Sequence, residues 1–312
     1  MSTQIDSNRS DSKTLDHYDD SIDLGEVFVV LWAGRLKIFV ITAIFAIASV
    51  IYALSVPNQY KATTLLAPAQ SSGGGLSGAL GQLGGLASLA GVSLGGGETS
   101  EAQIAQIIMK SRSFIEVFIE SNNLAVELYA TEGWDKASSK SIINSDSYDS
   151  ERKQWLFEGG APSSWTLYKA FSEKLSVSED IGTGLLSVSI EHYSPRIAKQ
   201  WLDLYVSGVN EHMQKRQMVK VTRNIEFLEA QIEKTNIAGM QEVFYTIIEE
   251  QIKSKMLAEA SPDYAFAVVS ASMVPEQKSQ PRRALISILG TLLGGMLSVL
   301  LVLVMHYART SD

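Results

Sequence analysis

Two long apolar runs stand out near the two ends of the chain, Ile38–Val56 and Ala284–Met305, and neither contains a charged residue. A helix needs roughly 20 apolar residues to cross the hydrocarbon core of a bilayer, and both runs have about that length. Basic residues flank each run, and Pro57 ends the first. The pattern therefore predicts two transmembrane helices, with a buried core helix as the weaker alternative for the first run.

The two spans divide the chain into a tail, a span, a large water-exposed domain, a second span and a short tail. Two spans place both termini on the same side of the membrane. Basic residues occur at both ends of each span, and long loops cross membranes largely regardless of charge, so the charges leave the orientation open. The predicted segments are 1–35, 36–56, 57–281, 282–306 and 307–312.

The second run contains a pair of glycines with the spacing G-x-x-x-G, at Gly290 and Gly294. This spacing lets two membrane helices approach closely. Glycine is also common in membrane helices in general, so an incidental pair is the alternative. If the pair is a contact site, we expect it to contribute to self-association of the protein.

The segment between the spans has strand-like stretches near both of its ends. Gln59–Pro68 contains the β-branched pair Thr63-Thr64 and is bounded by prolines, and Tyr264–Val274 is apolar, so each predicts a strand beside a span. These two strands are placed to pair with each other. Lys174–Ile181 and Gly184–Glu191 alternate apolar and polar residues around a glycine turn, which predicts a hairpin.

A very long helix is predicted from Ser194-Pro195, a capping serine followed by proline at the first helical position. Its pattern runs to about Asn236, breaks at Gly239 and resumes to about Ala260. At about 1.5 Å per residue, the first part alone is on the order of 60 Å long. Apolar positions lie toward both of its ends, and Asn210–Gln217 between them is polar. The pattern favours an extended rod or a helix–helix assembly over two ordinary helices with a kink.

Four other segments are less regular. Residues 1–23 are polar and predict a disordered tail, and Ser21–Trp32 predicts a short amphipathic helix before the first span. Ser71–Gly97 is uncharged and rich in glycine, serine and leucine, so a helix or loop packed on a neighbour is favoured over a flexible linker. Glu98–Asn122 predicts one helix, and Thr131–Pro162 predicts a loop. The fold class is an α+β membrane protein: two transmembrane helices, an α/β base near the membrane and a long helical arm.

Composition narrows the function. The net charge of −8 argues against a nucleic-acid partner, which would need a basic face to neutralise phosphates. The chain has no cysteine, which excludes disulfides, thiolate metal sites and cysteine nucleophiles. The four histidines have no second ligand at a metal-binding spacing: His17, His192, His212 and His306.

No sequence motif of a hydrolase, a metalloprotease or a nucleotide-binding loop occurs. The spans also lack the charges that a transporter or proton relay needs. We therefore expect no catalytic, cofactor-binding or metal-binding residues, and a structural or regulatory protein rather than an enzyme.

The order of segments resembles the Wzz-type polysaccharide chain-length determinants, also called polysaccharide co-polymerases. Four stretches carry the resemblance: the acidic approach to the first span, the strand after it, the end of the long helix with the last strand, and the proline-bearing approach to the second span. These are Ile22–Phe45, Gln59–Pro68, Glu249–Glu276 and Gln280–Gly295. The family's proline-rich segment often has a further proline, which Glu276–Gln280 does not supply.

The resemblance implies a two-pass protein of the bacterial inner membrane, with cytoplasmic termini and a periplasmic middle domain. It implies a homo-oligomer that works with a membrane-embedded polymerase to set the modal length of a lipid-linked polysaccharide, usually lipopolysaccharide O-antigen. Because the sequence stops at Asp312, the kinase-free type is expected. The alternative is a membrane-anchored periplasmic adaptor of a polysaccharide export system. A sensor with a periplasmic ligand domain is a further alternative, but it would need a cytoplasmic signalling domain.

Overall fold

The computed structural model describes residues 24–69 and 101–310. The predictions for the tail at 1–23 and for the glycine-rich segment at 71–97 lie outside these residues. The chain divides into two compact units. The first unit is Met1–Ser55 with Arg282–Asp312, and the second is Val56–Pro281.

The first unit is helical, with α1 at Leu24–Ala33, α2 at Arg35–Ser55 and α10 at Arg283–Thr310. Helices α2 and α10 are long and apolar enough to span a membrane, with mean hydropathies of 2.4 and 2.5. Only 6% and 17% of their apolar windows are buried within the protein. A core helix of a soluble domain would be mostly covered by its neighbours, so the exposed apolar surface favours a lipid environment.

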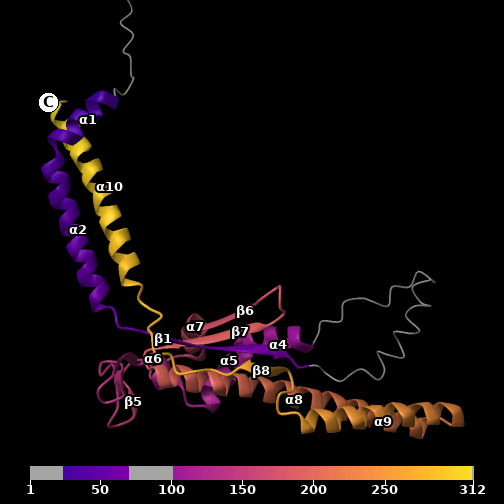
Figure 1. Cartoon of the computed structure of the whole chain (residues 1–312). Coiled ribbons are helices and arrows are strands. Elements are labelled where there is room, and N and C mark those ends of the chain that lie inside the picture. Colours follow the sequence, from indigo (N-terminus) through magenta and orange to yellow (C-terminus); the bar gives the residue numbers. More distant parts are fainter. Residues whose placement is uncertain (1–23, 70–100, 311–312) are drawn as a thin grey trace, which may run out of the picture. The chain divides into compact units, whose positions relative to one another are not determined.

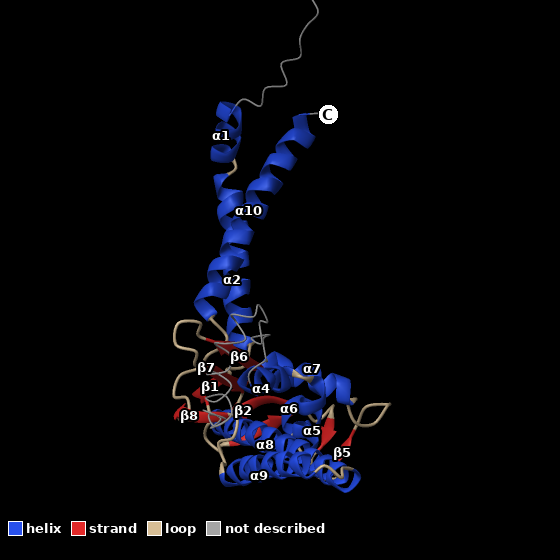
Figure 2. Cartoon of the chain, turned by 90° about the vertical axis from the view of Figure 1, so that its right-hand side faces the viewer, coloured by secondary structure: helices blue, strands red, loops and turns tan. Residues whose placement is uncertain are grey.

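Small residues form the contact between α2 and α10, which lie side by side in Figure 1 and Figure 2. A Cβ added at Gly290 would overlap Ser49, and one added at Gly294 would overlap Phe45. The G-x-x-x-G pair therefore is a helix-contact site, and its partner is α2 of the same chain. The expectation that these glycines join separate copies is not supported, because α2 already occupies them.

The contact between α2 and α10, called the seam below, can be tested by crosslinking, because the chain has no native cysteine. Thr42 Oγ1 lies 3.3 Å from Ser298 Oγ across the seam, so a T42C/S298C variant is expected to form a disulfide on mild oxidation. Adding G294A should reduce the crosslinked fraction severalfold, since the new methyl group forces the helices apart. G295A is the matched control, because its Cβ would meet only Thr42 Oγ1 at 4.0 Å. Equal crosslinking of the two variants on a gel would contradict the seam.

The second unit contains a four-stranded antiparallel sheet of order β6-β7-β1-β8. The strands are β1 at Tyr60–Pro68, β6 at Leu175–Glu179, β7 at Leu186–His192 and β8 at Phe266–Ser270. The predicted hairpin is confirmed as β6 and β7. The predicted pairing of the strands beside the two spans is confirmed as β1 and β8. The α+β fold class is likewise confirmed, with a mixed base, two apolar helices near the ends and a long helix.

The alternation of β1 shows which face of the sheet is packed. Ala62, Thr64 and Leu66 are buried, whereas the residues between them face away from the core. Strand β7 is buried along most of its length. This pattern is that of a sheet with one face packed against helices.

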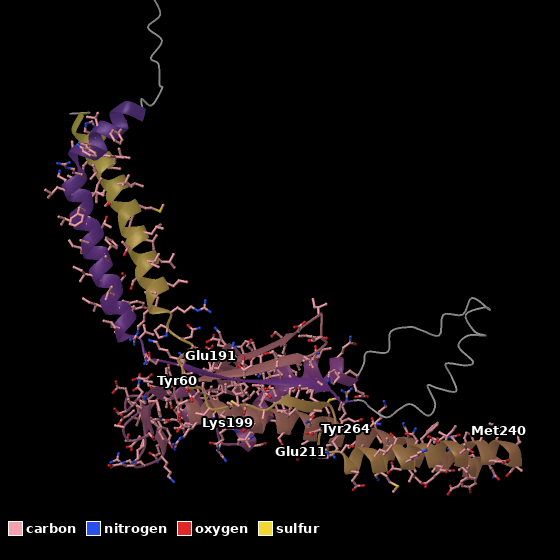
Figure 3. All side chains as sticks on the ribbon, viewed as in Figure 1. Tyr60, Glu191, Lys199, Glu211, Met240 and Tyr264 are labelled. Carbon is pink, nitrogen blue, oxygen red and sulfur yellow. The ribbon has the colours of Figure 1, made fainter. Side chains whose placement is uncertain are left out.

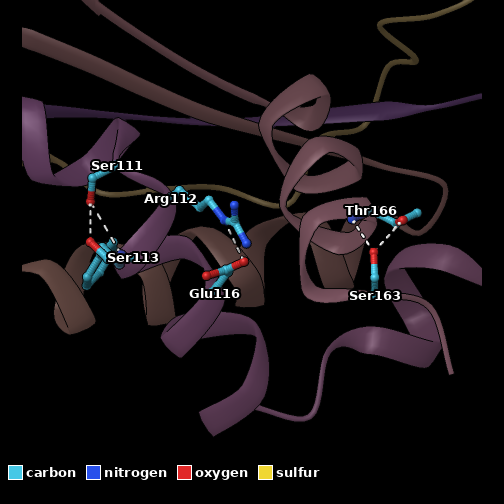
Figure 4. A network of polar contacts seen from close by, with 7 residues as sticks. Ser111, Arg112, Ser113, Glu116, Ser163 and Thr166 are labelled. Atoms are coloured by element: carbon cyan, nitrogen blue, oxygen red, sulfur yellow. Dashed lines mark hydrogen bonds and ion pairs between the residues drawn. The ribbon is translucent and has the colours of Figure 1, made fainter.

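The predicted single helix at Glu98–Asn122 is two helices, α4 at Glu101–Lys110 and α5 at Arg112–Ser121. Ser111 separates them because its side chain caps α5. Its Oγ accepts a hydrogen bond from the Phe114 N–H at 3.3 Å and donates one to Ile108 O at 2.8 Å. Figure 4 shows this serine at the start of α5. A capping serine begins a new helix because it has an extended backbone, as here.

The segment predicted as a loop, Thr131–Pro162, contains two short hairpins. Each of its strands has only two to five residues, too short for alternation to reveal from sequence. Two more helices flank this region. The elements are α6 at Ala125–Tyr129, β2 at Thr131–Asp135, β3 at Lys140–Ile143, β4 at Tyr148–Asp149, β5 at Gln154–Trp155 and α7 at Ser164–Lys174.

The long helix is α8, Pro195–Lys234, with 40 residues. Its predicted start is confirmed, since Ser194 Oγ accepts the Ile197 N–H. The break falls at 235–237, and Gly239 lies in the first turn of α9, Ala238–Ala260. Helix α9 folds back along α8 rather than extending it, as Figure 1 shows. The predicted long helix is therefore confirmed, and of the two arrangements predicted for it the structure has the helix–helix assembly, a two-helix arm.

The core of the second unit packs the first half of α8 against α4, α5, α7 and the sheet. Interlocking aromatic rings fill its centre, with centroids 5.0–6.1 Å apart for the pairs that join α8 to α5 and α7. Buried aromatic side chains contribute most to such a core. They are Phe114, Phe118, Phe171, Trp201 and Tyr205.

Asn210 of α8 holds strand β8 in place. Its Nδ2 donates to Phe266 O at 2.9 Å, and its Oδ1 accepts the N–H groups of Ala265 at 3.0 Å and Phe266 at 2.9 Å. The predicted polar section Asn210–Gln217 therefore is not uniformly solvent-facing, because Asn210 and Met213 are buried. The amide replaces the partner strand that these backbone groups would otherwise need.

Candidate functional site

His192, at the end of β7, is buried and structural. Its Nδ1 accepts the Ser194 N–H at 3.0 Å, so its Nε2 carries the proton and donates to Glu127 O at 3.3 Å. Burial lowers the pKa of His192 to about 4. The ring is therefore neutral near pH 7, and it ties α6 to the end of the sheet.

The other histidines do not converge on one site. His212 packs edge-on against Phe114 on α8, and partial burial lowers its pKa. His306 lies in α10 beside Tyr307. His17 lies outside the described residues. Within the described parts of the chain, no three histidine or carboxylate side chains lie close enough together to hold a metal ion.

The ion pairs of the described residues are local and exposed. Arg112 contacts Glu116 at 2.8 Å within α5, as Figure 4 shows. This hydrogen bond, helped by Ser164, lowers the pKa of the Glu116 carboxyl. Pairs of this kind on a helix surface contribute little to stability and provide no proton-transfer partner.

A polar hollow of about 430 Å³ lies where the end of β7 meets α6 and α7. Its lining includes five residues with amide, carboxylate or ammonium groups, Gln59, Gln280, Glu173, Lys174 and Glu191. Figure 3 shows Glu191 and Tyr60 at the same end of the sheet, far along α8 from Met240 at the tip of the arm. Sequence reasoning missed this hollow, because its residues come from five separate segments.

The rings of Tyr129 and Tyr193 also line the hollow. The Lys174 ammonium lies 5.1 Å from the centroid of the Tyr193 ring, an arrangement favourable for a cation–π contact. Burial lowers the pKa of Lys174, while Glu191 and Glu173 oppose this shift. Burial likewise raises the pKa of Tyr193. The hollow thus combines hydrogen-bond donors, acceptors and aromatic surface.

A second, shallower groove of about 540 Å³ runs along α8 beyond the core. It is strongly basic, with four cationic side chains and one histidine on successive turns. Its lining residues are His212, Lys215, Arg216, Val219, Lys220, Arg223 and Asn224.

Comparison with known proteins finds a family match for part of the chain. Residues 20–121 match the family model Wzz, described as chain length determinant protein. The chain carries a Wzz segment. This match agrees with the family resemblance found in the sequence, and it covers α1, α2, β1, α4 and α5. Of the four stretches that carry the resemblance, the first two lie within the matched residues.

Two solved structures are similar to the chain. One is a full-length bacterial polysaccharide co-polymerase, with 15% identity over 93% of this chain and 99% of that chain, and a TM-score of 0.39. The other is a fragment of WzzB, a polysaccharide co-polymerase from Salmonella Typhimurium, with 14% identity over 71% of this chain and 99% of that chain, and a TM-score of 0.30. No curated protein matches the chain significantly.

Proposed function

We propose that the protein regulates the modal chain length of a lipid-linked surface polysaccharide, foremost lipopolysaccharide O-antigen. It acts as an oligomeric scaffold with the polymerase of the same membrane, and it performs no bond-making or bond-breaking step itself. The observation that carries the proposal is the Wzz match over residues 20–121. The two long apolar helices, α2 and α10, support it by supplying a two-pass anchor.

The proposed location is the bacterial inner membrane, with both termini in the cytoplasm. The segments are a cytoplasmic tail at 1–35, spans at 36–56 and 282–306, a periplasmic domain at 57–281 and a cytoplasmic tail at 307–312. The compact unit Val56–Pro281 supports a separately folded periplasmic domain. The orientation follows from the family resemblance and not from the charges.

Exposed apolar side chains on α9 support self-association. Monomeric soluble proteins rarely expose large contiguous apolar surface, and such surface commonly marks an interaction site. The α8–α9 arm presents such side chains along its whole length, whereas the small-residue seam of the spans is already filled. The exposed α9 residues include Met240, Val243, Tyr245, Ile252 and Met256.

The test is the length distribution of the polysaccharide in a deletion strain and in the same strain complemented with the full chain. Deletion is expected to leave polymer present but to change a clustered set of lengths into a broad distribution falling off from short chains. Lipopolysaccharide gels show this directly. An unchanged ladder, in a strain without a second copy of the gene, would contradict the proposal. Complete loss of polymer would point instead to a component of polymerisation or export.

A further inference from the structure

We propose that the hollow at the end of β7 binds one or two sugar units of the polysaccharide, a neutral or amino sugar rather than an acidic one. This inference rests on the proposed function for the identity of the polymer. It goes further by assigning a binding site, made by Gln59, Gln280, α6, α7 and the end of β7.

The groups that line the hollow suit the chemistry of a sugar. A sugar ring has hydroxyl groups around its edge and an apolar face of C–H bonds. Carboxylates accept hydrogen bonds, an ammonium donates them, and amides do both. The hollow provides all three from Glu173, Glu191, Lys174, Gln59 and Gln280. Such a mixed set suits several hydroxyls pointing in different directions.

The hollow also has aromatic surface in its lining. Tyr129 lines the hollow and is 41% exposed. Its ring packs edge-to-face against Trp155 at 6.3 Å and Phe157 at 5.9 Å, and Trp155 packs edge-to-face against Tyr148 at 5.1 Å. Aromatic rings with one accessible face offer an apolar platform with little conformational entropy to lose. These rings hold Tyr129 in place from its edges, and Trp155 and Phe157, which stack on each other, add further aromatic surface beside the hollow.

The lining of the hollow carries more negative than positive charge. Two carboxylates, Glu173 and Glu191, face a single ammonium, Lys174, in the lining. Glu132 adds a further negative charge near Tyr193. The negative excess disfavours phosphate or uronic acid groups, since like charges at short range repel. Neutral and amino sugars meet no such penalty.

The backbone around the hollow is held in place by hydrogen bonds. The Gln59 N–H donates to Gln280 O at 3.0 Å, and the Ser279 N–H donates to Gln59 O at 2.8 Å, which fixes the backbone of both glutamines. On the other side, His192 holds Glu127 of α6 against β7. A preformed site loses less entropy on binding than one that must be ordered.

The experiment uses the full-length protein in detergent. The probe is a set of lipid-free oligosaccharides, one or two repeat units long, released by mild acid from the polymer of the host strain. Binding is measured by isothermal titration calorimetry. Tyr129→Ala and Glu173→Gln are each expected to weaken binding about tenfold or more, a loss of roughly 1.4 kcal/mol. Trp165→Ala is the matched control, because it removes an exposed aromatic side chain from α7 outside the hollow.

The expected pattern is weaker binding by both hollow variants and unchanged binding by Trp165→Ala, with circular dichroism showing that all three variants are folded at the temperature of the titration. Binding of a neutral sugar should also change little between roughly 0.05 M and roughly 0.5 M salt, because its hydrogen bonds are not screened as ion pairs are, whereas binding of a sugar with a free ammonium should weaken as salt rises. No binding by the unaltered protein, equal binding by the hollow variants, or displacement by inorganic phosphate would overturn the inference. If deletion still alters polymer length in that case, the proposed function stands and only the site is wrong. An unaltered ladder on deletion would remove the proposed function first.

Discussion

Replacing Asn210 by alanine is expected to lower the free energy of unfolding of the second unit by roughly 3 kcal/mol or more. The change leaves three buried backbone groups without their partner: the N–H groups of Ala265 and Phe266 and the carbonyl of Phe266. Each such group costs about 1–3 kcal/mol when it is buried and unpaired. Urea unfolding of the full-length protein, followed by tryptophan fluorescence, measures the loss.

Two variants sharpen this test. Asn210→Asp keeps an acceptor for the two N–H groups but turns a carboxylate toward Phe266 O, so it should also destabilise the domain. Glu211→Ala is the control, because Glu211 is the next residue of α8 and is exposed. If Asn210→Ala and Glu211→Ala unfold at the same urea concentration, the amide does not hold β8 in place.

The sequence predicted the parts of the fold that depend on local patterns. Both spans, the β6–β7 hairpin and the start of α8 follow from runs, alternation and a capping serine, all of which act within a few residues. The pairing of β1 with β8 was predictable as well, since two strand-like segments beside adjacent spans must start close together. The family resemblance rests on these same ordered elements.

The parts that failed depend on contacts between distant segments. The extents of α8 and α9 were predicted, but nothing local shows that α9 folds back on α8, where the Gln214 amide donates to Ala258 O at 2.8 Å. Ser111 is a capping residue within an otherwise continuous apolar stripe, so the stripe concealed the break. The glycine pair was recognisable as a contact motif, but only the structure identifies α2 as its partner.

The candidate site shows the same limit. Nucleophiles, ligand pairs and phosphate loops can be found in a sequence because each has a characteristic motif. The residues that line this polar hollow form no motif. Its lining combines residues as distant as Gln59 and Gln280, which meet through an isolated backbone bridge. The contact between Tyr129 and Trp155 could not be predicted from the sequence. Helix α6, which carries Tyr129, was not predicted, and strand β5, which carries Trp155, lies in a segment that was predicted as a loop.

A proline in the outer half of α8 is expected to abolish length control while leaving the domain folded. The helix has two parts: residues up to Met213 belong to the core, and beyond them only Val221 of α8 is buried. Glu226→Pro removes one backbone hydrogen bond and places the proline ring against the Thr222 carbonyl, which costs about 3 kcal/mol or more. The break falls in the arm, at an exposed position outside the core.

If the arm carries the scaffold function, this strain should show the broad ladder of the deletion strain. Glu226→Ala, which favours the helix, should keep the clustered ladder. Immunoblots of membranes establish that both variants are present in equal amounts. A clustered ladder from Glu226→Pro at normal protein level would show that the intact arm is not required.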